Sequence, residues 1–268
     1  MRGGKGSSII LWAIVLYLLI PLFMTLVYSL FTEWMDVLPK GFTLKYYAVI
    51  FRDAAFWQAL ARTVVISIVP VIAAAAMILL AMYVVVVYLP WLDKYLQIIC
   101  TIPYAVQGVI LPVSVLSLYA GAPAPLSNRI AMLTFTYCVV ILPYMYQGIK
   151  NSLISVDAPR LLEAAQMLGA DKFFAFFRII VPCMLSGVVI SSMLSVALIF
   201  GDFVIVNTIG GSYYSTAQMY LLKKMFISGQ VTSAVIIVLF VVTLAISAAV
   251  FWLKSKTVEI GAKEGEKA

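Results

Sequence analysis

Residues 157–182 read DAPRLLEAAQMLGADKFFAFFRIIVP and stand between two long apolar runs. The spacing predicts two short helices joined by a turn. Asp157 is a residue type that caps helices, and Pro159 suits a first helical turn. Gly169 can end that helix in the left-handed conformation, and Asp171 can cap the second helix. The proline at the end of the stretch predicts a break before the next apolar run.

The second of these helices has an aromatic face. Phe173, Phe176, Phe177 and Ile180 recur at the three- and four-residue spacing that places side chains on one side of a helix. A polar connection with so many aromatic rings needs a surface to cover them. Either they pack on the rest of the chain, or they form a knob that docks on a partner subunit.

The remainder of the chain is dominated by apolar residues. Hydrophobic residues make up 64% of the 268 residues and charged residues only 11%. Soluble domains are about 45–50% apolar, so the bilayer must be the solvent for much of this surface. A transmembrane helix needs roughly 20 apolar residues. Six runs meet this requirement: Ile9–Phe31, Thr63–Leu89, Tyr95–Tyr119, Ile130–Gly148, Cys183–Val206 and Val231–Leu253. The expected fold is an all-α integral membrane protein with six transmembrane helices.

Lysine and arginine residues favour one orientation of these spans. With the N-terminus in the cytoplasm, more of them fall on the inner side than on the outer side, as the positive-inside rule expects. Both termini and residues 149–182 are then cytoplasmic, and the aromatic stretch 32–62 lies at the outer interface. Residues 1–253 are expected to form one membrane domain, and residues 254–268 a charged cytoplasmic tail.

The inner loop resembles the EAA loop of the permease subunits of binding-protein-dependent ABC importers. Glu163-Ala164-Ala165, then Gly169 after three further residues, then an apolar run ending at Pro182 all match that motif. The motif is specific, because it combines sequence, spacing and place in the topology. The resemblance implies the fold of the type I importer permeases.

Two further stretches extend the resemblance over most of the chain. Residues 41–56 are similar to the outer segment before the second span of this family, and residues 200–205 are similar to its fifth-span signature. The chain departs from the pattern at Arg62, where the family often has asparagine, and in a short loop at 121–125. The pattern is closest to permeases of the polyamine, phosphonate and iron group, although sugar permeases share the same loop.

The resemblance implies roles and partners. In this family the loop is a coupling helix that sits in a cleft of the ATPase subunit, where its glutamate commonly pairs with a basic residue. The residues expected to make this contact are Glu163, Ala164, Ala165, Gly169, Phe173 and Phe177. The implied partners are two ATPase subunits, a second permease expected to be a different chain, and an extracytoplasmic substrate-binding protein. The implied location is the inner membrane.

One acid lies well inside a predicted span. Asp202 is near the outer end of the fifth run. An ionised group there is costly unless it faces protein or water, so Asp202 either borders the translocation pathway or stays hydrated near the interface, paired with Lys223 or Lys224. Ser191, Ser192 and Ser195 on the same span are interpreted as small packing residues rather than ligands.

Two similar hexapeptides occur in neighbouring spans. PYAVQG at 103–108 echoes PYMYQG at 143–148. Tyr104, Gln107 and Tyr144 would supply polar contacts in a pathway, unless the repetition reflects chance and helix packing. Together with Asp202, the tyrosines would suit a cationic solute such as a polyamine. Phosphonates, ferric complexes and sugars remain open.

The composition argues against catalysis by this chain. It has no histidine, and its three cysteines lack the spacing of metal ligands, so no cofactor or metal is expected. Residues 3–7 resemble a phosphate-binding loop only loosely, so ATP hydrolysis has to come from a partner. The net charge of +7 suits lipid head groups rather than nucleic acid. The first hypothesis is therefore a transport subunit whose ATP is hydrolysed by a partner. The competing hypotheses are a secondary transporter or channel and a membrane enzyme. Copurification of an ATPase would separate the first hypothesis from the other two.

Overall fold

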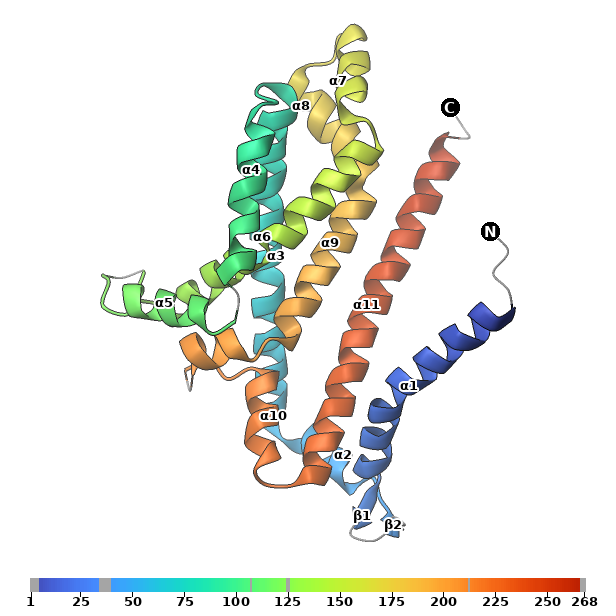
Figure 1. The fold of residues 1–268 in the computed structure, drawn as a ribbon, viewed down its shortest axis with the longest axis vertical. Helices are drawn as coiled ribbons and strands as arrows, with labels where there is room; N and C mark the ends of the chain where they lie inside the picture. The colour runs from blue at the N-terminus through green and yellow to red at the C-terminus, as the bar shows by residue number, and fades with distance from the viewer. Residues whose placement is uncertain (1–4, 34–39, 107, 124–125, 212, 266–268) are drawn as a thin grey trace. The chain divides into compact units, whose positions relative to one another are not determined.

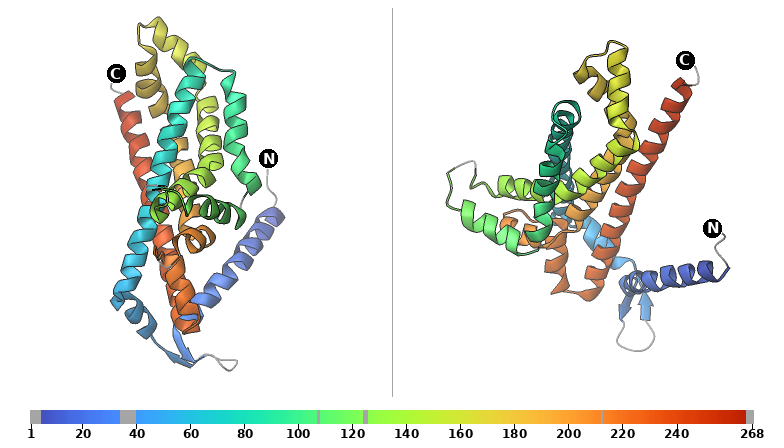
Figure 2. Two further views of the ribbon diagram at one scale, coloured as in Figure 1. Left: turned by 90° about the vertical axis from the view of Figure 1, so that its left-hand side faces the viewer. Right: turned by 45° about the horizontal axis from the view of Figure 1, so that its top comes forward.

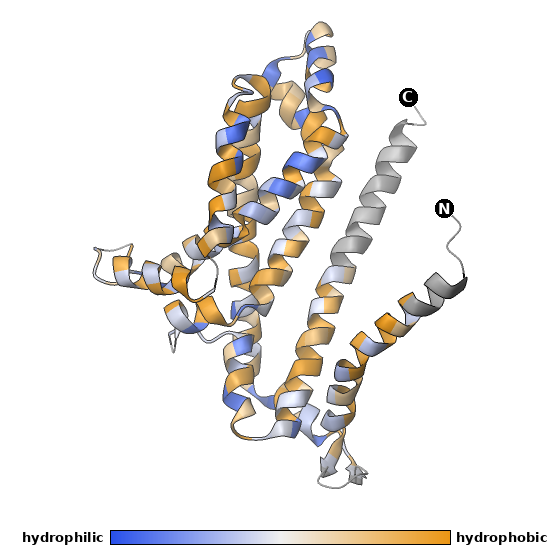
Figure 3. Ribbon diagram, in the orientation of Figure 1, coloured by the Kyte–Doolittle hydropathy of each residue, from blue (hydrophilic) through white to orange (hydrophobic). Residues whose placement is uncertain are grey.

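The computed structural model describes residues 5–33, 40–106, 108–123, 126–211 and 213–265. These residues are mostly helical, and apolar residues run along the long helices (Figures 1 and 3). Among these described residues, five helices are long and apolar enough to cross a membrane, and one bent helix pair would make a sixth span. They are Leu11–Ser29, Ala54–Val87, Arg129–Ser155, Lys172–Gly201 and Gly229–Ala248, with the pair Leu92–Val106 and Ile110–Tyr119. This agrees with the predicted all-α membrane fold of six transmembrane helices.

The chain divides into two compact units. One comprises residues 1–60 and 217–245, and the other comprises residues 61–216 and 246–268. Helices α3 (Ala54–Val87) and α11 (Gly229–Gly265) contribute residues to both.

The first unit contains a short hairpin that the sequence did not predict. Strands β1 (Phe31–Glu33) and β2 (Lys40–Phe42) pair antiparallel, with Phe31 opposite Phe42. The other elements are α1 (Lys5–Ser29), α2 (Lys45–Arg52), α10 (Ala217–Met225) and the first parts of α3 and α11.

An acid joins the start of α3 to α10 in this unit. The Tyr220 hydroxyl and the Lys224 ammonium donate to the Asp53 carboxylate over 2.8 and 3.1 Å. The hydrogen bond from Tyr220, supported by Lys224, lowers the pKa of the Asp53 carboxyl group. The Phe56 ring is fully buried and lies 5.5 Å from the Tyr220 ring.

The second unit is organised around a close helix pair. Its elements are α3, α4 (Leu92–Thr101), η1 (Ile102–Val106), α5 (Ile110–Tyr119), α6 (Arg129–Ser155), α7 (Ala158–Met167), α8 (Lys172–Phe174), η2 (Ala175–Ile180), α9 (Val181–Gly201) and η3 (Val206–Gly210). Helices α6 and α9 make the most extensive contact between elements. They approach closely because glycine on each faces serine on the other: Gly148 faces Ser191 and Gly187 faces Ser152. Ser191 and Ser195 are buried and bond to the backbone of their own helix, which agrees with their predicted packing role.

The third predicted span is broken rather than straight. Helix α4 passes into the tight helical turn η1, and α5 starts after Gly108 at a bend of 100° (Figure 2). Pro103 lacks an N–H group to continue the helix, and Gly108 has φ of +84°, a backbone conformation that suits glycine. The equivalent Pro143 stays inside the unbroken helix α6.

The last two spans end elsewhere than predicted. Helix α9 ends at Gly201, because Asp202 adopts an extended backbone with φ of −76° and ψ of 130°. The predicted end at Val206 is therefore wrong, and residues 206–210 form the separate turn η3. Helix α11 continues to Gly265 through most of the predicted tail, of which residues 266–268 lie outside the described part.

Candidate functional site

The first helix of the quoted segment ends in a defined glycine turn. The Gly169 N–H donates to the Gln166 carbonyl over 2.9 Å, and the Ala170 N–H donates to the Ala165 carbonyl over 3.0 Å. Gly169 has φ of +84°. This pair of bonds is a Schellman motif, which satisfies the last carbonyl groups of a helix. The predicted left-handed end of α7 at Gly169 is confirmed.

The start of this helix differs from the prediction. Asp157 lies in the left-handed region with φ of 48° and makes no capping hydrogen bond; its carboxylate instead lies 3.1 Å from the Arg160 Nε atom. Pro159 occupies the first turn as expected. Asp171 caps the next helix as predicted, because its side chain accepts from the Phe173 N–H over 3.1 Å.

Helix α7 has one covered face and one apolar, uncovered tip. Leu162 and Ala165 are buried, and α7 packs on η2. Glu163 and Ala164 are exposed. Met167 and Leu168 are each 90% exposed, directly before the Gly169 turn. These two residues were not among the predicted contact residues, although their place between the Glu-Ala-Ala stretch and the glycine is visible in the sequence.

The phenylalanines of the second predicted helix differ in whether they pack on the rest of the chain or stay exposed. Phe176 is fully buried and its ring centre lies 5.3 Å from that of Tyr83 on α3. Phe177 also contacts Tyr83, at 5.6 Å. Phe173 and Phe174 remain more than half exposed. The aromatic face therefore packs on the chain at its centre and is uncovered at its start. Tyr83 lies about 90 residues earlier in the sequence, and no local pattern indicates this contact.

Residues 157–182, here named the coupling segment after the role that the resemblance implies, continue directly into the fifth span. Elements α8, η2 and α9 form one apolar helix from Lys172 to Gly201. The predicted break at Pro182 is absent from this stretch, and Pro182 lies two residues after the end of a π-helical turn. Residues 175–180 form a wider π-helical turn at the join.

At the other end of α9, Asp202 holds the next turn against α6. Its Oδ2 atom accepts from the Tyr137 hydroxyl and from the Ile205 N–H, both over 2.9 Å. One interpretation of the sequence paired Asp202 with Lys223 or Lys224. Its hydrogen-bond partners in the structure are instead a tyrosine and the backbone. Lys224 pairs with Asp53 instead.

Asp202 also borders a small cavity. The cavity measures about 200 Å³, and its lining includes Gly108, Tyr137, Tyr144, Asp202 and Ile205. The break after η1 thus faces the same space as the turn after α9.

Two of the predicted pathway residues meet at this cavity and a third adjoins it. Tyr144 and Asp202 both line it. Tyr104 joins them indirectly, because its ring meets the Tyr144 ring edge-on at 5.3 Å. Gln107 lies outside the described residues.

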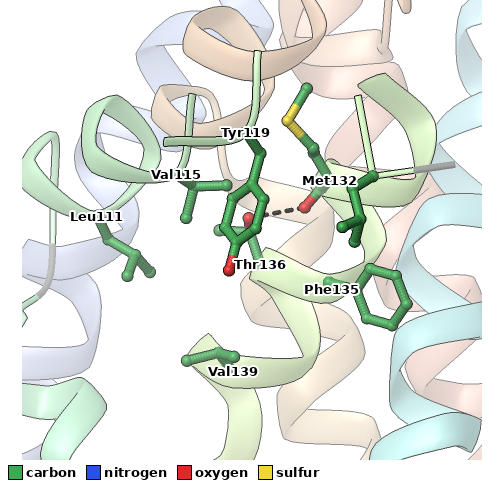
Figure 4. A pocket seen from close by; sticks show the side chains of 8 residues that line it. Leu111, Val115, Tyr119, Met132, Phe135, Thr136 and Val139 are labelled. Atoms are coloured by element: carbon green, nitrogen blue, oxygen red, sulfur yellow. Dashed lines mark hydrogen bonds between the residues drawn. The ribbon is translucent and has the colours of Figure 1, made fainter. Parts of the chain in front are cut away.

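A second hollow between α5 and α6 is different in chemistry. It measures about 340 Å³ and is lined mainly by apolar side chains, among them Leu111, Val115 and Phe135 (Figure 4). The hydroxyl of Thr136 donates to the Met132 carbonyl over 2.7 Å, so toward a ligand it could act only as an acceptor. No charged residue is among those that line it. A polar solute would find more hydrogen-bonding groups in the cavity beside Asp202.

A polar network, also unpredicted, ties α4 to α6. The Lys150 ammonium donates to the Asp93 carboxylate over 2.9 Å, to Gln97 over 3.1 Å and to the Tyr146 hydroxyl over 3.1 Å. Tyr146 in turn donates to Asp93 over 3.0 Å. Among the described residues, no group of three or more histidine, cysteine, aspartate or glutamate side chains is placed to hold a metal ion.

A known protein family matches the greater part of the chain. The family is described as "Binding-protein-dependent transport system inner membrane component", and it matches residues 77–258. This range contains the coupling segment, the cavity and four of the predicted spans in full.

Individual relatives of the chain are also named as permease proteins. The chain is 24% identical to the spermidine/putrescine transport system permease protein PotC of Escherichia coli (strain K12), over 96% of this chain and 95% of that protein. It is 23% identical to the putative 2-aminoethylphosphonate transport system permease protein PhnV of Salmonella paratyphi A, over 70% of each. It is 28% identical to the probable ABC transporter permease protein y4fN of Sinorhizobium fredii over 55% of this chain, which spans only 26% of that relative's length.

Proposed function

The chain belongs to the family of binding-protein-dependent transport system inner membrane components, and we propose that residues 157–182 couple it to the ATPase subunits that drive import. Membership makes it a multi-pass permease subunit of an ABC importer in the inner membrane. The contact with the ATPase is assigned to Glu163, Ala164, Ala165, Gly169, Phe173 and Phe177, and we add Met167 and Leu168.

The observation that carries this proposal is the uncovered tip of α7. Met167 and Leu168 expose 90% of their surface at the end of a helix whose other face is buried. Large apolar side chains at an exposed tip are typical of surfaces that bind a partner. Glu163 is exposed on the same helix and is available for a charge-assisted contact.

The tip is also built to transmit force. The Schellman bonds fix the end of α7, and the Asp171 cap fixes the start of the next helix. A turn defined by hydrogen bonds on both sides moves as a body, whereas a slack connection would absorb the displacement of the ATPase.

We assign the solute pathway to the cavity beside Asp202, with Tyr104, Gln107 and Tyr144. Two relatives are named for 2-aminoethylphosphonate and for spermidine and putrescine, all of which carry amino groups. A carboxylate and two tyrosine rings would favour such a cationic group. A small amine-bearing solute is therefore the substrate class that we propose.

Family membership supports a proposal for the assembly. One six-span subunit forms half of a pore, so a second permease, a different chain, would complete it. Two ATPase subunits would bind on the cytoplasmic side, and a substrate-binding protein would deliver the solute outside. We place both termini in the cytoplasm, because only then does the α7 tip meet an ATPase.

The coupling proposal is tested on the purified complex of the permeases and ATPase subunits. Glu163→Ala is expected to weaken ATPase retention about tenfold or more, because charge-assisted hydrogen bonds are worth about 1.5–3 kcal/mol. Gly169→Val is expected to weaken it further, because a β-branched residue is strained at φ of +84°. Gly169→Asn should be milder, since asparagine tolerates that conformation.

A matched control separates the tip from general damage. Gly121→Val also adds a side chain at a glycine with no neighbour within 4 Å, but this glycine has no positive φ. It should retain the ATPase at the wild-type level. Full ATPase retention and normal putrescine uptake in both Glu163→Ala and Gly169→Val would mean that this segment is not the coupling element.

A further inference from the structure

Tyr83 is the centre of an aromatic cluster at the end of α3. Its ring centre lies 5.3 Å from Phe176, 5.6 Å from Phe177, 5.8 Å from Phe173 and 5.7 Å from Tyr88. Three of these four partners belong to the coupling segment. The phenylalanines also contact one another, with Phe173 and Phe177 at 4.6 Å and Phe176 and Phe177 at 5.2 Å.

The cluster holds the coupling segment from two sides. The Tyr83 and Tyr88 hydroxyls lie 3.3 Å apart, which links the last turn of α3 to the residue just beyond it. The Lys172 ammonium lies 5.1 Å from the centre of the Tyr88 ring, a cation–π contact at the first residue of α8. The start of α8 and the following π-helical turn η2 are therefore both attached to α3.

Without this cluster, the coupling segment would be connected to α9 along the backbone but would lack these contacts with α3. Elements α8, η2 and α9 are one continuous helix, so a displacement of α7 passes to α9 along the backbone. Helix α3 has no such direct backbone path, because residues 88–156 separate it from the segment. Side-chain contacts must carry any motion that reaches α3.

We propose that Tyr83 is a positioning residue that makes α3 move together with the coupling segment when the ATPase subunits close. This rests on the proposed docking of α7 on the ATPase. Aromatic rings have two side-chain torsions, and close-packed rings resist sliding. Each aromatic pair contributes a free energy equivalent to about two- to tenfold in an equilibrium constant, so three pairs to one ring favour joint over separate movement.

The test measures distances within the assembled importer, so it needs no knowledge of the solute. Spin labels are placed at Arg160→Cys on α7 and Met77→Cys on α3, both exposed positions, in a chain whose native cysteines are replaced. Pulsed electron paramagnetic resonance then gives the distance without nucleotide and after trapping with ATP and vanadate. A second pair, Arg160→Cys with Leu194→Cys on α9, follows the covalent path.

In the otherwise unchanged chain, the α7–α3 distance should stay the same in both states, because the two helices move together. Tyr83→Ala should make it change by about 2 Å, the scale of helix shifts in such transitions, while the α7–α9 distance stays constant. Tyr83→Phe keeps the ring and loses only the hydroxyl contact, so it should behave as the parent chain does. Tyr95→Ala, which removes a tyrosine that pairs with Trp91, should have no effect.

The outcomes separate this proposal from a role in stability alone. A constant α7–α3 distance in Tyr83→Ala, or a changing one in the parent chain, overturns it. If Tyr83→Ala does not assemble, Phe176→Ala removes a buried ring from the other side of the cluster, one not assigned to the ATPase contact, and must give the same α7–α3 change. Failure of the docking proposal is distinguishable, because the ATPase would then be retained equally with and without Glu163→Ala.

Discussion

Individual glycines determine how closely the central helices of the second unit can approach. A Cβ atom on Gly148 would overlap the side chain of Ser191, and one on Gly187 would overlap that of Ser152. The two pairs are reciprocal, with glycine and serine four residues apart on each helix. In a bilayer the lipid is as apolar as leucine, so such close contact replaces the hydrophobic effect as a source of helix association.

We expect Gly187→Ala to destabilise the protein by about 1–3 kcal/mol, the usual cost of overpacking a close contact. The measurement is the thermal unfolding midpoint of the purified permease in detergent. Gly201→Ala on the same helix is the control, because its Cβ would meet no atom within 4 Å. Combining Gly187→Ala with Ser152→Gly should restore much of the loss. An unchanged midpoint in Gly187→Ala would show that α6 and α9 do not need this approach.

The two residues that flank α7 show what local sequence can and cannot reveal. Gly169 was predicted correctly, because a left-handed helix end is a backbone requirement that glycine meets by itself. Asp157 was assigned as a cap and is not one, because its carboxylate pairs with Arg160 instead. Asp157 and Arg160 are both visible in the sequence. Whether Asp157 caps the helix or pairs with Arg160 depends on the backbone angle at Asp157.

Among the elements, α9 connects the two candidate sites. It is continuous with the coupling segment at one end, and at the other Asp202 fixes the following turn to Tyr137. A shift of α9 along its axis would therefore reach the wall of the cavity through Leu198 and Ile199, which line it, and through the hydrogen-bonded Asp202 carboxylate. This gives Asp202 a structural role whether or not a solute touches it.

Removal of the Tyr137 hydroxyl separates these roles. Tyr137→Phe leaves the Asp202 carboxylate one donor short and should cost about 1–3 kcal/mol of stability. The double variant, Tyr137→Phe with Asp202→Asn, should lose less stability than the two single variants lose in sum, because the two residues share one interaction. The thermal midpoints of the two single variants and the double variant give this coupling.

The same variants bear on the solute pathway. If an amine passes Asp202, Asp202→Asn should lower putrescine uptake more than Tyr137→Phe does at matched protein stability, because only the first change removes the negative charge. Equal uptake by the two variants would leave Asp202 with the structural role alone.

The break in the third span shows why elements were predicted better than their interruptions. The apolar run 95–119 satisfies the length of a span, and the structure uses it as α4, η1 and α5. Proline and glycine are residue types that loosen a helix, as Pro103 and Gly108 do here, yet the equivalent Pro143 and Gly148 lie in an unbroken helix. The difference is tertiary, since Gly148 packs on Ser191 while a Cβ at Gly108 would meet no atom within 4 Å.

At the scale of the whole molecule, much of the apolar surface is left uncovered by this chain. Trp12, Leu16 and Tyr17 on α1 are more than 60% exposed. Such surface is stable only against lipid or protein, as a transmembrane helix in a larger assembly provides. Composition predicted this correctly, whereas contacts between distant segments, such as Tyr83 with the coupling segment, could not be derived from periodicity.

The orientation of the chain can be tested directly. ATP is hydrolysed in the cytoplasm, so the α7 tip can meet an ATPase only if residues 149–182 are inside, as the positive-inside rule also predicts. Arg160 and Phe226 are both highly exposed and lie on opposite sides in the predicted topology. Each is changed to cysteine in a background with Cys183→Ala, because Cys183 is the exposed native thiol and the other two are buried.

A membrane-impermeant maleimide should label Phe226→Cys but not Arg160→Cys in right-side-out spheroplasts. In inverted vesicles the pattern should reverse, and detergent should make both cysteines reactive, which controls for buried thiols. Labelling of Arg160→Cys from outside intact spheroplasts would place the coupling segment on the wrong side of the membrane for any ATPase. The docking of α7 and the joint movement of α3 would then both be untenable, because each depends on force applied from the cytoplasm.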